Sequence, residues 1–264
     1  MQYQWGFIGC GNMGGTLVRA VAKNAKSGEI AVCDLDETKT EALSKACGVV
    51  VENLETIAKE SRFLVLGVKP QAMEKTLSPL RGKIGKDTIL VTMAAGVTIE
   101  RLRSYVGAYP VVRIMPNTPA ALGEGVILYC TDGVNGTDEA DFQTAFAAAG
   151  LVDKLDESEI DAAGALSGCG PAFVYYFAEA LIEGAVASGL SREKAEKYAA
   201  QTLVGGGKML QTYGDPVVLR KAVCSPNGTT LAGIGKMEEL GFKMAAEKAV
   251  EAAYRRTLEL QRGE

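Results

Sequence analysis

Three glycines near the start of the chain constrain its fold more than any other feature. Gly9, Gly11 and Gly14 form the pattern Gly-x-Gly-x-x-Gly directly after an apolar run that ends at Ile8. The run predicts a strand, and the glycines predict a tight turn into a helix whose N–H groups and positive dipole face a pyrophosphate. A glycine-rich turn without a ligand is the alternative, but the position at the first strand of an alternating series favours a dinucleotide site.

The first 155 residues or so of the 264 alternate short β-branched runs with helical segments, which is typical of βαβ units. Strands are expected at 4–9, 30–33, 49–51, 63–68, 88–93, 111–115, 126–129 and 151–155. Helices are expected at 16–24, 38–46, 54–60, 71–80, 99–105 and 138–149. The sequence therefore predicts an α/β fold, with a Rossmann-type, mostly parallel sheet in an N-terminal domain of residues 1–156.

From residue 157 onward, the sequence becomes Ala-rich and helical, with Gly and Pro between the segments. Helices are expected at 171–188, 216–223, 230–240 and 243–259. A further helix is expected to begin after Ser191, its N-cap residue. Their apolar faces can be buried internally or against a second subunit, and they predict an all-helical domain of residues 157–264. The run Gly205–Gly207 indicates either close helix packing or a local helix break.

The adenosine ribose of a bound dinucleotide is usually read by a carboxylate about 20 residues after the glycines. Asp34 stands at this position, at the end of the second predicted strand. A carboxylate there accepts hydrogen bonds from the 2′-hydroxyl and repels a 2′-phosphate. Asp36 and Glu37 add negative charge, so the residues favour NADH. The alternative is that Asp34 only caps the following helix.

The chain contains no His, and it has 28 Lys and Arg against 32 Asp and Glu, for a formal charge of -4. The absence of imidazole excludes a Ser-His-Asp triad or a Cys-His dyad within one chain, and no metal site is expected. No basic cluster of the kind that binds nucleic acid is present. Nucleic acid is therefore not an expected partner.

The 6 cysteines contain no Cys-x-x-Cys pair. This spacing is typical of reduced cytoplasmic thiols. The N-terminus has no features of a signal peptide, and no apolar run approaches the roughly 18 residues of a membrane span. We therefore expect a cytoplasmic protein without a membrane partner.

Further motifs follow the glycine pattern in order: Val68–Pro70, Ala94–Thr98, Arg113–Pro119, Leu166–Ala172 and Ser225–Thr230, the last continued by Leu231–Ile234. Over almost the whole chain, this series resembles the pyrroline-5-carboxylate reductase family. The resemblance implies an oxidoreductase that uses NADPH or NADH to reduce the C=N bond of 1-pyrroline-5-carboxylate to L-proline, the last step of proline biosynthesis. It also implies a homodimer, or a larger ring of dimers, formed through a helical dimerisation domain.

The resemblance also assigns roles by position. Residues at the ends of the predicted strands, or just after them, would bind the cofactor: Ile8, Gly9, Gly11, Asn12, Met13, Gly14, Asp34, Asn53, Val68, Lys69, Pro70, Ala94, Ala95 and Gly96. The substrate would bind between the helical domains of two subunits, at Val223, Ser225, Gly228, Thr229 and Thr230. Many family members prefer NADPH and carry a small, polar or basic residue in place of Asp34. Cys169 and Cys224 stand where Ser is common, and we interpret them as tolerated small residues.

The residue types suit this chemistry. In Ser225–Thr230, Gly228 exposes N–H groups just before a helix, which suits a carboxylate, and the Thr230 hydroxyl can orient the imine and relay its proton. An N-capped turn is the alternative. Lys69 is expected near the cofactor's phosphates or nicotinamide ribose, although Pro70 can simply end the strand. Asn117 is expected to shape the active-site loop.

Two other functions compete with this interpretation. A 3-hydroxyacid dehydrogenase would carry Lys and Asn one helical turn apart after its glycine-rich helix entry, but Gly168–Pro171 is followed by Ala-Phe-Val-Tyr-Tyr. A dinucleotide sensor without turnover is the second alternative. The presence of Ser225 and Thr230 argues against it.

Overall fold

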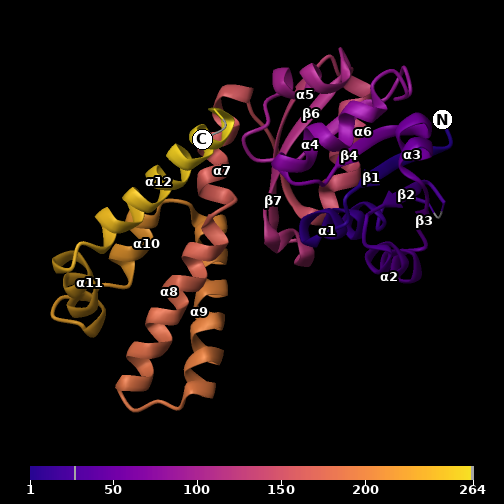
Figure 1. Ribbon diagram of the computed structural model, residues 1–264. Coiled ribbons are helices and arrows are strands. Elements are labelled where there is room, and N and C mark those ends of the chain that lie inside the picture. The colour runs from indigo at the N-terminus through magenta and orange to yellow at the C-terminus, as the bar shows by residue number, and fades with distance from the viewer. Residues whose placement is uncertain (27, 263–264) are drawn as a thin grey trace. The chain divides into compact units, whose positions relative to one another are not determined.

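An eight-stranded sheet forms the centre of the first part of the chain (Figure 1). The computed structural model describes residues 1–26 and 28–262. The strands are β1 (Tyr3–Ile8), β2 (Ile30–Cys33), β3 (Val50–Val51), β4 (Ser61–Leu66), β5 (Ile89–Thr92), β6 (Val111–Pro116), β7 (Gly125–Asp132) and β8 (Gly150–Lys154). Their spatial order is β3-β2-β1-β4-β5-β6-β7-β8, and β6 with β7 is the antiparallel pair. The predicted Rossmann-type, mostly parallel sheet is confirmed.

Helices cover both faces of this sheet. Strand β1 contributes to two apolar clusters: Trp5 and Phe7 pack into one, and Tyr3 and Ile8 into the other. The first cluster is completed by α1 (Asn12–Val21), α2 (Glu37–Cys47) and α6 (Gly136–Phe146). The second is completed by α3 (Leu54–Glu60), α4 (Pro70–Leu77), α5 (Ile99–Val106) and α7 (Glu157–Ser167). A central strand buried on both faces explains why the sequence shows continuous apolar runs rather than polar alternation.

Element boundaries differ from the sequence predictions where polar or glycine residues take part in regular structure. Helix α1 begins at Asn12 rather than at residue 16, because the glycine turn leads directly into it despite the poor helix propensity of glycine. Strand β4 begins at Ser61 rather than at 63, since Ser61 pairs with Tyr3 of β1. The helices expected to end at 80 and 149 finish in the 3-10 turns Ser78–Leu80 and Ala147–Ala149. A further 3-10 turn spans Thr118–Leu122.

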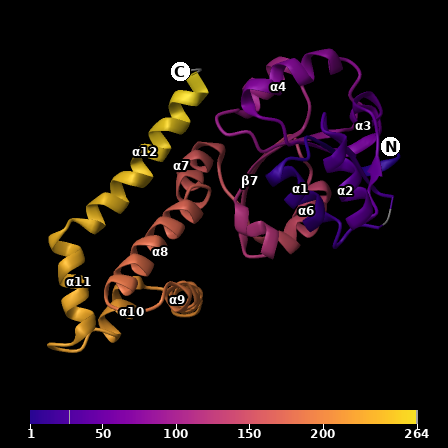
Figure 2. The same cartoon turned by 60° about the horizontal axis from the view of Figure 1, so that its bottom comes forward.

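The chain forms two compact units. The first unit contains residues 1–169 and the chain from Ala253 onward, and the second contains Gly170–Ala252. The second unit consists of α8 (Gly170–Ala187), α9 (Arg192–Tyr213), α10 (Pro216–Ala222), α11 (Thr229–Glu239) and the first part of α12 (Phe242–Arg262). Helices α8 and α9 lie side by side (Figure 2). Because α7 and the last turns of α12 belong to the first unit, these units divide the chain differently from the expected domains 1–156 and 157–264, which remain a prediction.

Helix α9 continues without interruption through Gly205, Gly206 and Gly207. The helix break considered from the sequence is therefore wrong. An added Cβ at any of the three would meet no atom of the described chain within 4 Å. Close packing against another helix is the interpretation that remains from the sequence.

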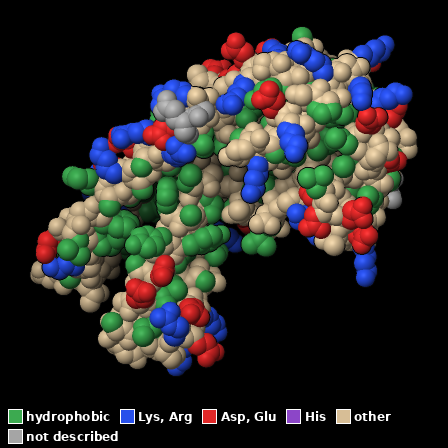
Figure 3. Space-filling model, in the orientation of Figure 1, with side chains coloured by type: hydrophobic (Ala, Val, Ile, Leu, Met, Phe, Trp, Pro, Cys, Tyr) green, Lys and Arg blue, Asp and Glu red, His purple; other side chains and the backbone are tan. Residues whose placement is uncertain are grey.

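The second unit leaves much apolar surface uncovered. Among its residues, all of which lie in the described part of the chain, the buried hydrophobic core contains only Ala195, while Tyr175 and Tyr176 are exposed. Figure 3 shows many apolar side chains along these helices. The expectation that no stretch is apolar enough for a membrane span is wrong by length and composition, since the helical stretch Glu157–Ala187 qualifies and little of its apolar window is buried within the subunit. A surface of this kind indicates an interaction site.

Candidate active site

The turn between β1 and α1 needs each of its glycines for a different reason. Gly9 has a φ of +92°, where an added Cβ would meet the backbone of Gly67 at 2.7 Å. A Cβ on Gly14 would lie 2.1 Å from the carbonyl oxygen of Gly9, so only glycine lets α1 start this close to the turn. A Cβ on Gly11 would meet nothing within 4 Å. The space beside Gly11 is therefore open to a ligand.

Two helices of the first unit start without a side-chain cap. Helices α2, α3, α5, α6 and α7 are capped by Asp36, Asn53, Thr98, Asn135 and Asp156. In contrast, α1 starts after Gly11 and α4 after Lys69, and within the described structure neither has a capping side chain or an acidic residue in its first turn. The unpaired N–H groups suit an anion. These residues therefore fit the pyrophosphate of a dinucleotide.

Replacing Gly14 with alanine should destabilise the first unit by about 1–3 kcal/mol, because the methyl group would clash with the Gly9 carbonyl and push α1 away from the turn. Cofactor binding should weaken with it. Gly15→Ala is the matched control, since its Cβ would have its nearest contact at 3.4 Å. Urea unfolding and cofactor titration of both variants test the expectation. Equal behaviour of the two would contradict the close approach at Gly14.

The cofactor residues expected from the sequence follow the carboxyl ends of five strands. The ladder aligns Ile8 of β1 with Cys33 of β2 and Leu66 of β4, and Leu66 with Thr92 of β5. These strands are parallel, so the segments that follow them lie along one edge of the sheet, where α/β proteins bind ligands. The structure brings these residues together there: Gly9–Gly14, Asp34, Asn53, Val68–Pro70 and Ala94–Gly96. Lys69 is exposed, and it forms no ion pair with any residue that the structure describes.

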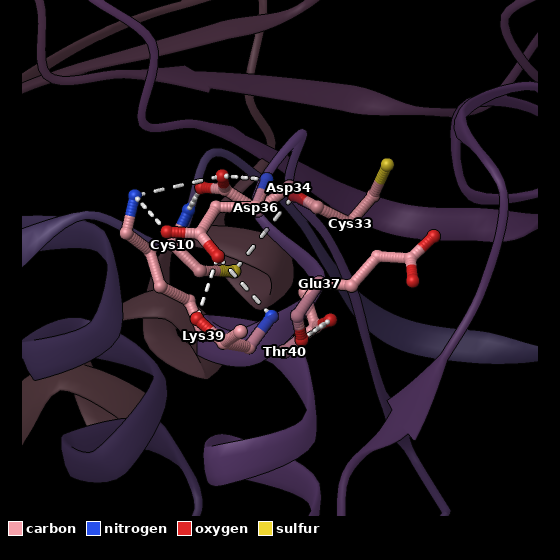
Figure 4. Close-up of polar contacts among 8 residues, drawn as sticks. Cys10, Cys33, Asp34, Asp36, Glu37, Lys39 and Thr40 are labelled. Carbon is pink, nitrogen blue, oxygen red and sulfur yellow. Dashed lines mark hydrogen bonds and ion pairs between the residues drawn. The ribbon is translucent and has the colours of Figure 1, made fainter.

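Asp34 links the end of β2 to the glycine turn (Figure 4). Its Oδ2 accepts a hydrogen bond from the Cys10 N–H at 2.6 Å, and its Oδ1 accepts one from the Asp36 N–H at 2.9 Å. The residue that caps α2 is Asp36, so the alternative that Asp34 caps this helix is wrong. Asp34 is thus held at the position expected for a ribose-reading carboxylate.

A cavity of about 280 Å³ opens beside Asp34. Its polar lining consists mainly of carboxylates, with Asp34, Glu37, Glu41 and Glu52 next to Asn53. The Asn53 Oδ1 accepts the Thr56 N–H at 2.9 Å, so this side chain also caps α3. The cavity fits the adenosine end of a dinucleotide whose pyrophosphate lies at α1. The sequence predicts Asp34 and Asn53 at this site, whereas Glu41 and Glu52 carry no sequence signal that places them beside the cavity.

Cys10 lies inside the glycine turn but is not a candidate nucleophile. Its side chain is buried, and its Sγ lies 3.8 Å from the carbonyl oxygen of Cys33. Burial, reinforced by the negative charge of Asp34, raises the pKa of this thiol to about 12. Cys10 therefore stays protonated at neutral pH and acts as a small apolar residue.

A buried ion cluster fixes the segment after β5. Arg113 of β6 is 1% exposed; it pairs with Asp161 of α7 and lies 3.3 Å from Glu157. Glu157 also accepts the Ile99 N–H at 2.8 Å, and Gln261 of α12 donates to Asp161. The cluster thus ties the start of α5, just after Ala94–Gly96, to β6 and to both helices. This role of Arg113 is not among the predictions from the sequence, although a lone Arg within an apolar strand is a visible signal of a buried pair.

Asn117 is buried at the end of β6, as expected for a residue that shapes a loop. Its Nδ2 donates to the Ser167 carbonyl at 2.9 Å, and its Oδ1 accepts the Val126 N–H at 2.8 Å. One side chain thus joins the ends of β6 and α7 to the start of β7. A position in the active site remains a prediction.

The segment Val223–Thr230 connects α10 to α11 in the second unit. The Gly228 N–H donates to the Ser225 carbonyl at 2.9 Å, and a Cβ on Gly228 would lie 2.4 Å from Ser225 Oγ, so a side chain here would displace the serine hydroxyl. Asn227 has a φ of +60°, the left-handed conformation that asparagine tolerates. Helix α11 begins at Thr229, with no side-chain cap and no acidic residue in its first turn among the described residues. Its N–H groups can therefore bind a carboxylate.

Comparisons with known proteins agree with this arrangement. Residues 157–260 match the family model described as pyrroline-5-carboxylate reductase dimerisation. Residues 4–96 match the model described as NADP oxidoreductase, coenzyme F420-dependent.

Individual relatives match over nearly the whole chain. Pyrroline-5-carboxylate reductase of Arabidopsis thaliana is 36% identical over 263 residues, which cover 98% of this chain and 95% of the relative. The enzyme of that name from Escherichia coli K12 is 35% identical and covers 95% of each chain. A crystal structure of Plasmodium falciparum pyrroline carboxylate reductase with NADP bound superposes with a TM-score of 0.89, at 31% identity and 99% coverage of both chains.

Proposed function

The chain belongs to the pyrroline-5-carboxylate reductase family, and we propose that it reduces 1-pyrroline-5-carboxylate to L-proline with NAD(P)H. The observation that carries this proposal is similarity of more than 30% identity to such reductases across both the sheet and the helices. NAD(P)H, when bound, would supply a hydride to the C=N carbon, and the ring nitrogen would keep or take one proton. One imine, one NAD(P)H and one proton thus give proline and NAD(P)⁺.

We propose that the first unit binds and orients the dinucleotide. The uncapped start of α1 would hold the pyrophosphate, and Asp34 with Asn53 would face the adenosine ribose. Val68–Pro70 and Ala94–Gly96, which follow β4 and β5, would line the nicotinamide half. Holding two reactants in a reactive orientation supplies much of the rate enhancement, so this chemistry does not need a histidine.

We propose that the second unit binds the substrate. The N–H groups at the start of α11 and the Ser225 hydroxyl would bind the carboxylate, with Val223, Gly228 and Thr229 beside them. The Thr230 hydroxyl would hydrogen-bond the ring nitrogen, orient the imine and relay its proton. This assignment uses each hydroxyl for a task that a hydroxyl can perform at neutral pH without being ionised.

The activity is tested by following absorbance at 340 nm while the purified enzyme is mixed with NAD(P)H and 1-pyrroline-5-carboxylate. Loss of absorbance that requires the imine is the expected result. Binding of the cofactor without imine-dependent oxidation would support the sensor alternative. NAD⁺ reduction by 3-hydroxy acids would support the dehydrogenase alternative.

The match of residues 157–260 to a dimerisation domain shows that the chain carries the part through which this family associates. We propose a homodimer, or a ring of dimers, that covers the apolar surface of α8 and the glycines of α9. The stretch Glu157–Ala187, which contains α7 and α8, lies within the matched region, so we interpret its apolar surface as a subunit contact rather than a membrane span. Light scattering from the purified protein gives the number of subunits; a monomer at micromolar concentration would contradict the proposal.

We further propose a cytoplasmic location. All 6 cysteines are free, two of them buried and four partly exposed. Free thiols persist where the compartment is reducing.

A further inference from the structure

The turn between β2 and α2, residues 34–36, contains two carboxylates where the cofactor's adenosine ribose is expected to bind. In a dinucleotide site, donors at this turn decide between a ribose 2′-hydroxyl and a 2′-phosphate, which differ by almost two negative charges. The turn of this chain holds Asp34 and Asp36, with Lys39 one helical turn further along (Figure 4). The partners of these three side chains determine which cofactor fits.

Asp36 occupies the donors that a 2′-phosphate would need. Its Oδ1 accepts the Thr38 N–H at 3.2 Å and the Thr38 hydroxyl at 2.6 Å, and its Oδ2 lies 3.3 Å from Lys39 Nζ. A backbone N–H at a helix start, a hydroxyl and an ammonium group make up a typical phosphate-binding set. In this chain one carboxylate engages all three.

The carboxylate of Asp36 is ionised at neutral pH. The hydrogen bond from Thr38 and the nearby Lys39 ammonium lower the pKa of Asp36 below its ordinary value. At neutral pH the donors therefore face a permanent negative charge. A 2′-phosphate would have to take these donors from the Asp36 carboxylate and would then lie close to its negative charge.

Unlike Asp36, the Asp34 carboxylate retains free positions that can accept hydrogen bonds. An ionised carboxylate offers about four lone-pair sites. The Cys10 and Asp36 N–H groups use two of them, and Lys39 Nζ stands 3.8 Å from Oδ1. About two sites remain, which matches the two donors of a ribose 2′,3′-diol.

The cavity beside Asp34 is also lined by negatively charged side chains. Glu37, Glu41 and Glu52 line it together with Asp34, and neither Lys nor Arg is among its described lining residues. The Tyr3 hydroxyl donates to Glu52 Oε1 at 3.3 Å, and the Asn53 N–H donates to Oε2 at 3.2 Å, which orients this carboxylate. A 2′-phosphate placed here would meet four carboxylates with no lysine or arginine in the lining to offset them.

We propose that Asp36 acts as a built-in substitute for the 2′-phosphate, so that the chain selects NADH over NADPH, while Asp34 accepts the ribose hydroxyls. The proposal rests on the dinucleotide site of the proposed function. It assigns selection to repulsion and to occupied donors rather than to extra contacts with NADH. Asp36 is thus the specificity-determining residue, because its ion pair keeps Lys39 from binding a 2′-phosphate.

The test compares binding of NADH and NADPH by titration calorimetry, without substrate. The wild-type protein should bind NADH at least about tenfold more tightly than NADPH. Asp36→Ser keeps an N-cap for α2 but removes the charge, and it should narrow this ratio by about tenfold, mainly through tighter NADPH binding. Asp34→Asn should instead weaken NADH binding, because it removes the charged acceptor of the diol.

Two further variants separate the proposed cause from general effects of charge. Adding Lys39→Met to Asp36→Ser should abolish the gain in NADPH affinity, since the freed ammonium is the group expected to contact the phosphate. Asp141→Ser removes an exposed carboxylate of α6 that does not line the cavity, and it should leave the ratio within about twofold. A similar change in Asp141→Ser and Asp36→Ser would show that net charge, and not the turn, sets the preference.

The outcomes distinguish this inference from the proposed function. Equal binding of both cofactors by the wild-type protein, tighter binding of NADPH, or an unchanged ratio in Asp36→Ser would overturn the selection by Asp36. Selective binding of NADH with no oxidation on addition of 1-pyrroline-5-carboxylate would leave the selection intact and refute the reductase activity. Binding of neither cofactor would refute both.

Discussion

Replacing Arg113 with methionine is expected to lower the free energy of unfolding of the first unit by about 3–5 kcal/mol, because it leaves the carboxylate of Asp161 buried without its cation. Gln261 can still donate to Asp161, but a neutral amide does not balance the charge. The loss should extend to the Ile99 N–H, whose acceptor Glu157 is oriented by the same guanidinium.

The single Trp of the chain provides the measurement. Trp5 is 2% exposed and stacks on Phe63 with ring centroids 4.3 Å apart, so its fluorescence reports unfolding of the first unit during urea titration. Lys83→Met is the control, because it breaks an ion pair with Glu55 that is exposed on both sides and should leave the midpoint almost unchanged. A second variant, Arg113→Met with Asp161→Leu, should recover part of the stability by removing both charges. Similar midpoints for Arg113→Met and wild type would contradict the account of the cluster.

Replacing Thr230 with alanine is expected to lower kcat/KM for the imine by about tenfold to a hundredfold or more, because it removes the hydroxyl proposed to hold the ring nitrogen. The side chain is exposed in the first turn of α11, so the change should not disturb the fold of this subunit. Thr230→Ser keeps the hydroxyl and should restore most of the activity.

The kinetic pattern identifies the role of the hydroxyl. If Thr230 acts mainly in the reacting complex, kcat should fall with little change in KM, and binding of NADH should be unaffected. If the pH dependence of kcat differs from that of wild type in Thr230→Ala but not in Thr230→Ser, this would indicate that the hydroxyl relays a proton. Kinetics equal to those of wild type would remove Thr230 from the site.

The sequence predicts the sheet well because its signals are local. Strands such as Ile30–Cys33 are β-branched apolar runs bounded by polar residues, and the structure reproduces this one without change. The helix Leu54–Glu60 also has the expected bounds, with Asn53 as its capping residue. The glycine pattern succeeds for the same reason, since each glycine answers a backbone requirement within a few residues.

The parts that the sequence does not predict depend on contacts between distant segments. The pairing of Arg113 with Asp161 spans 48 positions, and that of Gln261 with Asp161 spans 100. Asp36 is visible in the sequence as a negative charge, but its engagement of Thr38 and Lys39 depends on the backbone conformation of the turn. A sequence shows that a residue is charged, but only the structure shows which groups already form hydrogen bonds or ion pairs with it.

The return of α12 to the first unit has a consequence for the order of folding during synthesis. Chains emerge from the ribosome N-terminus first, and domains commonly fold as they appear. In this chain Gln261, which donates to Asp161, lies 100 positions after it, so α12 is made well after the sheet. The sheet can form early, but the segment after β5 gains its final support only after α12 has emerged. A nascent chain is therefore expected to be less resistant to proteolysis at Ala94–Ile99 than the released protein.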